Sequence, residues 1–130
     1  MLKIERERAV EKILCVDDDF SLLCLSQEEF SEGGYEVILA RDGKEALSKF
    51  KEEKPQLVVL DIRMRGMDGI ETLNALLDID PQAQVILNAG YPQCKENFRT
   101  WAAAAYALQS SDMGELKEKI SEVLKKKGSL

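Results

Sequence analysis

Five short apolar runs, separated by longer amphipathic segments, constrain the fold of this chain more than any other feature. The runs that predict strands cover residues 12–16, 35–39, 57–60, 85–87 and 106–108. The run at 57–60, LVVL, contains no polar residue, which is typical of a strand buried on both faces of a sheet. The chain therefore predicts a sheet whose two faces are both covered by other elements.

The segments between these runs have apolar residues at helical spacing and residues that begin and end helices. The segments that predict helices cover residues 20–32, 43–54, 69–79, 93–103 and 113–127. Gly33 and Gly34 are typical of a helix C-terminus. Asp42 is suited to cap the second helix, and Pro55 ends it. The chain thus alternates five strands with five helices.

This alternation determines the class of fold. Strands that are joined by helices run parallel, and right-handed connections place the helices on both faces of the sheet. We therefore predict an α/β fold, a three-layer, doubly wound domain with a five-stranded parallel sheet and five helices. Two strand orders are common among such sheets, and the periodicity alone does not choose between them. The 130 residues suffice for one domain, with its core at residues 11–126 and an N-terminal extension at residues 1–10.

The composition excludes several classes of function. The net charge of −6 argues against a nucleic-acid-binding module, whose surface is normally basic. No apolar run approaches the length of a membrane span, and the first residues lack the apolar stretch of a signal peptide, so a cytoplasmic protein is expected. The chain has no histidine, which excludes histidine as a general base or metal ligand. Its three cysteines, Cys15, Cys24 and Cys94, fit no zinc or redox spacing and are expected to be buried free thiols.

Acidic residues follow two of the predicted strands at the point where each strand ends. Asp17 and Asp18 follow the first strand, and Asp61 follows the third. Because ligands of parallel sheets bind beyond the carboxyl ends of the strands, we expect these three carboxylates to converge. Carboxylates that lie close together repel one another, and a hard cation such as Mg²⁺ is the usual remedy. Asp61 could then act as a nucleophile toward phosphorus, whereas the alternative for the run 17–19 is helix capping.

Two segments resemble the receiver domains of response regulators in two-component signalling. The segment ILCVDDD is similar to the first strand of that family, and LVVLDIRMRGMDG is similar to its phosphoacceptor loop. The segments VILNAGY and AYALQSSDM occupy the places of its fourth and fifth strand ends, so that the resemblance extends over residues 11–126. The resemblance implies a flavodoxin-like sheet with the strand order 2-1-3-4-5.

The resemblance also implies roles for individual acidic residues. Asp17 and Asp18 match the acidic pair that holds Mg²⁺ in this family. Asp61 matches the phosphoacceptor, which binds the metal as well. Arg63 matches the position that offers its backbone carbonyl to the ion. The resemblance therefore implies a magnesium site that is built around the phosphoacceptor.

The chain departs from the family pattern at the phosphate pocket. Ala89 and Tyr106 match the small pocket residue and the aromatic switch residue of the family. Asn88 stands where the family has threonine or serine, so that pocket and switch would use an amide in place of a hydroxyl. Gln109 stands where the family has lysine, and it keeps a donor but loses the charge, which weakens phosphate binding. Ser110 replaces a proline that is commonly preceded by a cis bond.

The resemblance implies a phosphorylated signalling domain and not an enzyme. A histidine kinase or a phosphotransfer protein would donate the phosphoryl group to Asp61 in the presence of Mg²⁺. Phosphorylation would change the surface that the predicted helix 93–103, the strand 106–108 and the last helix form, and a partner would recognise that change. That surface could bind an effector domain or a second copy of the chain, and no direct contact with nucleic acid or with a membrane is expected.

Other functions stay open at this point. A degenerate receiver would bind its partner whatever the state of Asp61, and the changes at Asn88 and Gln109 favour that alternative. A hydrolase of the aspartyl-phosphate type would need a nucleophile in the run 17–19 and a basic residue later in the chain. A flavin site is disfavoured, because the chain lacks a hydroxyl-rich phosphate loop after the first strand.

Overall fold

The computed structural model describes residues 10–61, 69–88, 107–108 and 113–128 of the chain. The strands form one parallel sheet in the order β2-β1-β3-β4-β5. They are β1 (Lys12–Val16), β2 (Glu36–Ala40), β3 (Leu57–Asp61), β4 (Val85–Asn88) and β5 (Ala107–Leu108). This sheet confirms the predicted α/β fold and the strand order that the resemblance implied.

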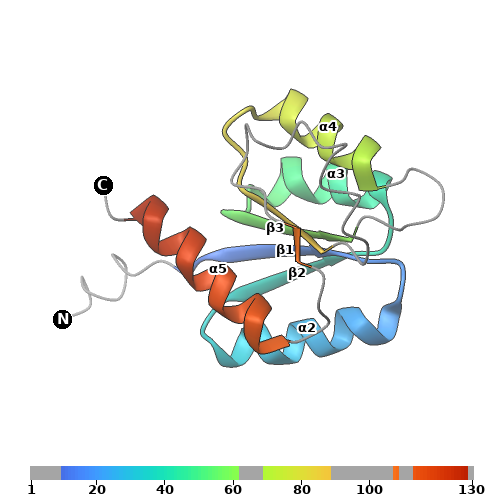
Figure 1. Ribbon diagram of the computed structural model, residues 1–130. Helices are drawn as coiled ribbons and strands as arrows, with labels where there is room; N and C mark the ends of the chain where they lie inside the picture. Colours follow the sequence, from blue (N-terminus) through green and yellow to red (C-terminus); the bar gives the residue numbers. More distant parts are fainter. Residues whose placement is uncertain (1–9, 62–68, 89–106, 109–112, 129–130) are drawn as a thin grey trace.

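Helices cover both faces of the sheet, as Figure 1 shows. The described helices are α2 (Phe20–Glu32), α3 (Gly43–Glu53), α4 (Gly69–Ile79) and α5 (Met113–Gly128). Helices α3 and α4 pack on one face of the sheet, and α2 and α5 pack on the other. The helix predicted at residues 93–103 lies outside the described residues, so the expectation of five helices stays a prediction. None of the described helices is both long and apolar enough to cross a membrane.

The side chains of the central strands alternate between the two helical layers. In β1, Leu14 and Val16 belong to the core beneath α3 and α4. Ile13 and Cys15 belong to the core that α2 and α5 cover, and all four side chains are buried. The strand β3 is buried in the same way on both sides, which is why its apolar run contains no polar residue. This two-sided burial holds β1 and β3 in the middle of the sheet.

The second strand begins one residue later than predicted. The pattern predicts a strand over residues 35–39, whereas β2 covers Glu36–Ala40. The turn after α2 explains the difference, because Gly34 has a positive φ of 95° and the Tyr35 N–H donates to the Phe30 carbonyl oxygen at 3.3 Å. Tyr35 is therefore still part of the turn that ends the helix.

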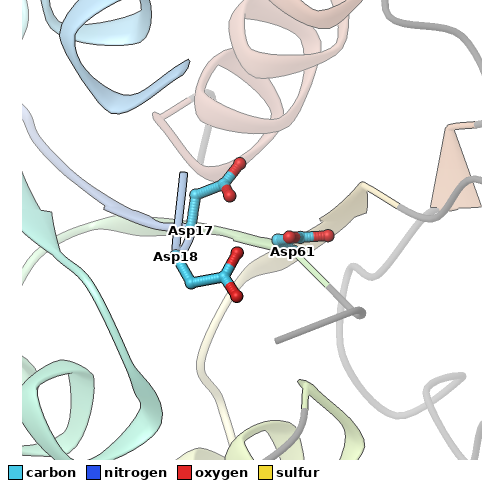
Figure 2. A group of neighbouring side chains, drawn as sticks. All are labelled: Asp17, Asp18 and Asp61. Carbon is cyan, nitrogen blue, oxygen red and sulfur yellow. The ribbon is translucent and has the colours of Figure 1, made fainter. Parts of the chain in front are cut away.

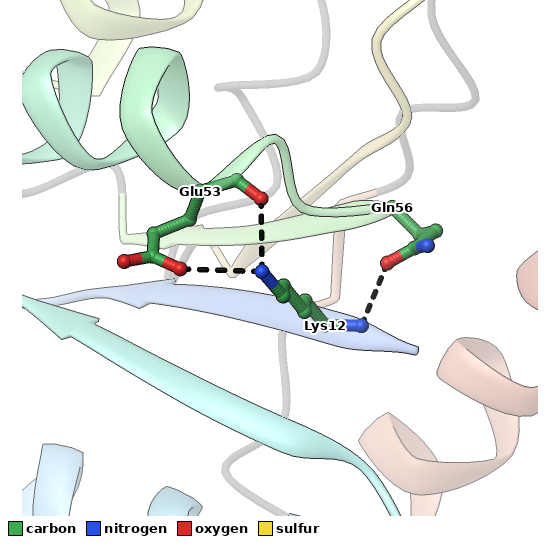
Figure 3. Close-up of polar contacts among 3 residues, drawn as sticks. All are labelled: Lys12, Glu53 and Gln56. Carbon is green, nitrogen blue, oxygen red and sulfur yellow. Dashed lines mark hydrogen bonds and ion pairs between the residues drawn. The ribbon is translucent and has the colours of Figure 1, made fainter. Parts of the chain in front are cut away.

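Polar contacts at the amino-terminal edge of the sheet tie β1 to the connection between α3 and β3 (Figure 3). The Lys12 Nζ atom lies 3.3 Å from Glu53 Oε1 and donates to the Glu53 carbonyl oxygen at 3.4 Å. The Lys12 backbone N–H donates to Gln56 Oε1 at 2.7 Å, and the Gln56 N–H donates to the Lys12 carbonyl oxygen at 3.0 Å. This Lys12–Glu53–Gln56 cluster fixes where β3 begins relative to β1.

The cysteines differ from one another in their burial. Cys15 is a buried free thiol in β1, as predicted, and burial raises its pKa to about 12. Cys24 is exposed on α2, so the prediction that it is buried is wrong. The helix buries Leu23 and Phe30 against the sheet, and Cys24 lies about 100° around the helix axis from Leu23. Cys94 lies outside the described residues.

Lys54 follows α3 in the left-handed conformation, with φ of 51° and ψ of 59°. A residue with a Cβ atom is strained in this conformation, whereas glycine is not. We predict that Lys54→Gly raises the free energy of unfolding by about 0.5–1 kcal/mol, measured by urea titration. The same change at Lys51, an exposed residue inside α3, should lower it by about 1 kcal/mol. A loss of stability in Lys54→Gly would contradict the prediction.

Candidate metal centre

Three carboxylates meet at the carboxyl-terminal edge of the sheet (Figure 2). Asp61 is the last residue of β3, and Asp17 and Asp18 follow the last residue of β1. The two strands are adjacent, with Val16 opposite Leu60, so that Asp17 is level with Asp61. Each of the three acids offers one carboxylate oxygen, and these oxygens lie within 4.8 Å of one another. The structure thus brings together the three acids that we expected to converge.

Asp17 is held through both its backbone and its side chain. Its N–H donates to the Ala40 carbonyl oxygen at 3.1 Å, at the end of the neighbouring strand β2. Its Oδ1 atom accepts the backbone N–H of Asp19 at 3.0 Å. Asp17 and Asp61 are half-buried, whereas Asp18 is exposed. The carboxylate cluster therefore has one member in solvent and two that are partly withdrawn from it.

The surroundings of Asp17 disfavour its charged form. Burial raises the pKa of the Asp17 carboxyl above its usual value, and the negative charges of Asp18 and Asp19 raise it further. The Asp19 N–H and a hydrogen bond with the Asp61 side chain act in the opposite direction and lower that pKa. A bound cation would favour the charged forms of all three carboxylates, because it attracts each of them.

The third acid of the run, Asp19, caps a helix. Its Oδ1 atom accepts the N–H groups of Ser21 at 3.0 Å and of Leu22 at 3.3 Å, which makes it the N-cap of α2. Capping is the alternative interpretation for the whole run 17–19, and the structure confirms it for Asp19. Asp17 and Asp18 belong to the carboxylate cluster.

Among the other predicted site residues, the structure describes the backbone of Asn88. Asn88 ends β4 and pairs with Asp61 in the register of β3 and β4, so its backbone is next to the carboxylate cluster. Leu108 ends β5 and pairs with Asn88. The remaining predicted site residues lie outside the described residues and stay predictions: Arg63, Ala89, Tyr106 and Gln109.

The contacts of Arg41 at this edge of the sheet were not predicted. The Arg41 guanidinium lies 5.3 Å from the centre of the Phe20 ring, which joins the residue after β2 to the first residue of α2. The Arg41 N–H also donates to Glu45 Oε1 at 2.8 Å, and Asp42 Oδ1 accepts the Glu45 N–H at 2.8 Å. Asp42 and Glu45 have the spacing of a capping box, which is a signal present in the sequence. The cation–π contact joins residues that are distant in the chain and has no such local signal.

The chemistry of the donor set fits a hard divalent cation. The cluster offers only carboxylate oxygens, and Mg²⁺ prefers one or two carboxylates together with water, carbonyl and phosphate oxygens. The mutual repulsion of Asp17, Asp18 and Asp61 adds a further reason for a cation to bind there. The arrangement can therefore hold a metal ion and present the Asp61 carboxylate to an incoming electrophile.

Comparisons with protein families, with individual proteins and with solved structures agree with one another. The family model described as "Response regulator receiver domain" matches residues 13–121 of the chain. Sporulation initiation phosphotransferase F of Bacillus subtilis is 33% identical over 116 residues, which cover 88% of this chain and 94% of that protein. The alkaline phosphatase synthesis transcriptional regulatory protein PhoP of Bacillus subtilis is 48% identical over 66 residues, which cover 51% of this chain and 28% of that protein. The chain thus spans most of the first relative but only a small part of the second.

Two solved structures resemble most of the chain. The response regulator protein TrrA of Thermotoga maritima in complex with Mg(2+)-BeF superposes with a TM-score of 0.80 and 37% identity, covering 87% of this chain and 98% of that one. The same protein in complex with the histidine kinase ThkA superposes with a TM-score of 0.79 and 37% identity, covering 88% of this chain and 99% of that one. The similarity therefore extends over both sequence and fold.

We predict that Mg²⁺ stabilises the folded protein through the carboxylate cluster. Mg²⁺ at about 100 times its dissociation constant should raise the free energy of unfolding by about 2.7 kcal/mol, measured by urea titration. Protons compete with the metal for Asp17, whose pKa is raised, so this gain should shrink as the pH is lowered.

A change at Asp61 tests whether the cluster is responsible for the effect of Mg²⁺. Without metal, Asp61→Asn should be more stable than the wild type, because one of three neighbouring like charges is removed. Its gain in stability from Mg²⁺ should be smaller. Asp78→Asn removes the same charge from an exposed position on α4 and should keep the wild-type gain. An undiminished gain in Asp61→Asn would show that Mg²⁺ acts elsewhere.

Proposed function

This chain belongs to the family of response regulator receiver domains, and we propose that its carboxylate cluster is the place where it accepts a phosphoryl group. In this proposal Asp61 is the phosphoacceptor, and Asp17, Asp18 and the backbone carbonyl of Arg63 hold Mg²⁺ together with it. The observation that carries the proposal is the convergence of three carboxylate oxygens within 4.8 Å at the ends of β1 and β3. The function is then signalling through covalent modification.

The proposed reaction moves a phosphoryl group from a phosphohistidine of a partner to Asp61. A carboxylate oxygen of Asp61 attacks the phosphorus while the bond between phosphorus and imidazole nitrogen breaks. The electron pair of that bond stays on the imidazole nitrogen, which takes up a proton, and Asp61 becomes an acyl phosphate. Mg²⁺, when bound, neutralises charge on the transferred group. The register of β3 with β1 holds Asp61 beside Asp17 and Asp18 during the attack.

The proposed phosphoryl donor is a histidine kinase or a phosphotransfer protein. These 130 residues contain no histidine, so the phosphohistidine that donates the phosphoryl group cannot be one of them. The complex of Thermotoga maritima TrrA with the histidine kinase ThkA supports a donor of this class. The proposed output surface is formed by residues 93–103 and 106–108 together with α5, and it would bind an effector domain or a second copy of the chain. A cytoplasmic location is part of the same proposal.

Incubation with acetyl phosphate and Mg²⁺ tests the role of Asp61 without any partner protein. We predict that the wild type gains the mass of one phosphoryl group in intact-protein mass spectrometry and is retarded in a Phos-tag gel. Both changes should disappear when Mg²⁺ is removed with a chelator, because the charge of the incoming group is then not neutralised.

Two variants complete this experiment. Asp61→Ala should gain no phosphoryl group, because the attacking carboxylate is gone. Asp78→Ala removes an exposed aspartate from α4 and should be phosphorylated like the wild type. If Asp61→Ala is phosphorylated as fully as the wild type, the assignment of Asp61 is wrong.

Two residues of the predicted phosphate pocket favour a second function. Asn88 replaces the hydroxyl residue of the family, and Gln109 replaces its lysine. The pairing of the Asn88 backbone with Asp61 supports a contact between residue 88 and the phosphoryl group. A degenerate receiver with these changes would bind its partner whether or not Asp61 is phosphorylated. Partner binding would then be the same in Asp61→Ala and in the presence of a chelator.

Restoring the family's residues distinguishes the two functions. A charge-assisted hydrogen bond is stronger than a neutral one, so we predict that Gln109→Lys with Asn88→Thr increases phosphorylation by acetyl phosphate about fivefold. The conformational response, measured by changes in NMR chemical shifts, should increase as well. Gln27→Lys adds the same charge at an exposed position on α2 and should change neither quantity. If the double variant matches the wild type in both quantities, these two residues do not limit the switch.

A further inference from the structure

Asp19 makes contacts that join the start of α2 to the carboxylate cluster. Its Oδ1 atom accepts the N–H groups of Ser21 and Leu22 at 3.0 Å and 3.3 Å. Its own backbone N–H donates to Asp17 Oδ1 at 3.0 Å. One residue is therefore both the cap of a helix and a hydrogen-bond donor to a member of the cluster.

We propose that Asp19 is a positioning residue of the metal site. By capping α2, Asp19 keeps its own backbone N–H hydrogen-bonded to Asp17 Oδ1. This hydrogen bond fixes the direction of the Asp17 carboxylate. This inference rests on the proposed function, because it takes Asp17 as a metal ligand. The carboxylate oxygens that gather at the site belong to Asp17, Asp18 and Asp61, so Asp19 acts through Asp17 and does not bind the cation itself.

The backbone geometry explains how the cap controls the direction of the N–H. Asp19 has φ of −94° and ψ of 106°, the extended conformation of an N-cap residue. Its carbonyl oxygen accepts the Leu23 N–H at 3.1 Å, in addition to the two bonds that its side chain accepts. Without a side-chain acceptor, the first turn of α2 has unpaired N–H groups and frays. The N–H of residue 19 is then free to turn away from Asp17.

The fixed direction matters because of the neighbours of Asp17. Asp17 is half-buried, and its carboxylate lies with those of Asp18 and Asp61 within 4.8 Å. Repulsion from the negative charges of Asp18 and Asp19 favours rotation of the Asp17 side chain away from the cluster. The hydrogen bond from Asp19 opposes this rotation and stabilises the negative charge on Oδ1. The cap therefore keeps the three ligands gathered before a cation arrives.

Two variants that differ only in the cap test this role. Asp19→Ser and Asp19→Ala both remove the charge, but only serine retains a side-chain acceptor for the first turn. We expect the serine variant to bind Mg²⁺ about fivefold more tightly than the alanine variant, measured by isothermal titration calorimetry. Asp19→Asn should behave like Asp19→Ser. The titrations are made at a temperature where all variants are fully folded, so a cap that served stability alone would leave the affinity unchanged.

The amide of residue 19 provides a second measurement that needs no metal. Its hydrogen exchange, followed by NMR in the metal-free protein, should be slow in the wild type and in Asp19→Ser. It should be faster in Asp19→Ala, where the cap is lost, and in Asp17→Ala, where the acceptor is lost.

The outcomes separate this inference from the proposed function. Equal Mg²⁺ affinity of the serine and alanine variants, or a rapidly exchanging residue-19 amide in the wild type, would overturn the positioning role and leave the role of Asp61 intact. A wild-type protein that binds no Mg²⁺ would overturn the proposed function and this inference with it.

Discussion

The register between β1 and β3, with Val16 opposite Leu60, is the constraint on which the site depends. Both strands are buried between two helical layers, and their side chains point alternately into one core and the other. A shift of either strand by one residue would exchange the side chains of the two cores and would move Asp61 out of line with Asp17. Core packing therefore sets the register, and the proximity of three like charges follows from it although those charges repel one another.

Sequence reasoning succeeded where a local pattern and a general rule of parallel sheets were sufficient. The run LVVL followed by Asp61 predicted a central strand, and the place of Asp17 and Asp18 after another strand predicted that the three acids converge; both predictions are confirmed. The strand order came from the resemblance to a family, because the two common orders produce the same periodicity. The roles of Arg63 and Gln109 remain predictions.

The remaining differences depend on tertiary geometry that residue spacing does not contain. Cys24 lies in an apolar part of α2, yet the helix buries only a narrow stripe through Leu23 and Phe30. The sequence assigned Asp17 and Asp18 to the metal site but did not predict which role Asp19 has, because the turn from strand to helix is what directs its side chain to the cap of α2 and its N–H to Asp17. The start of β2 was displaced by the turn at Gly34, whose positive φ can be recognised only from the backbone.

The Lys12–Glu53–Gln56 cluster lies where β1 and β3 begin, whereas the carboxylates lie where these strands end. It aligns β3 with β1 about 16 Å before the chain reaches Asp61, since each residue of a strand adds about 3.3 Å. The backbone alignment that brings Asp61 level with Asp17 is thus held at the opposite end of these two strands. The position of the reacting acids and the binding of a cation therefore depend on opposite ends of the same pair of strands.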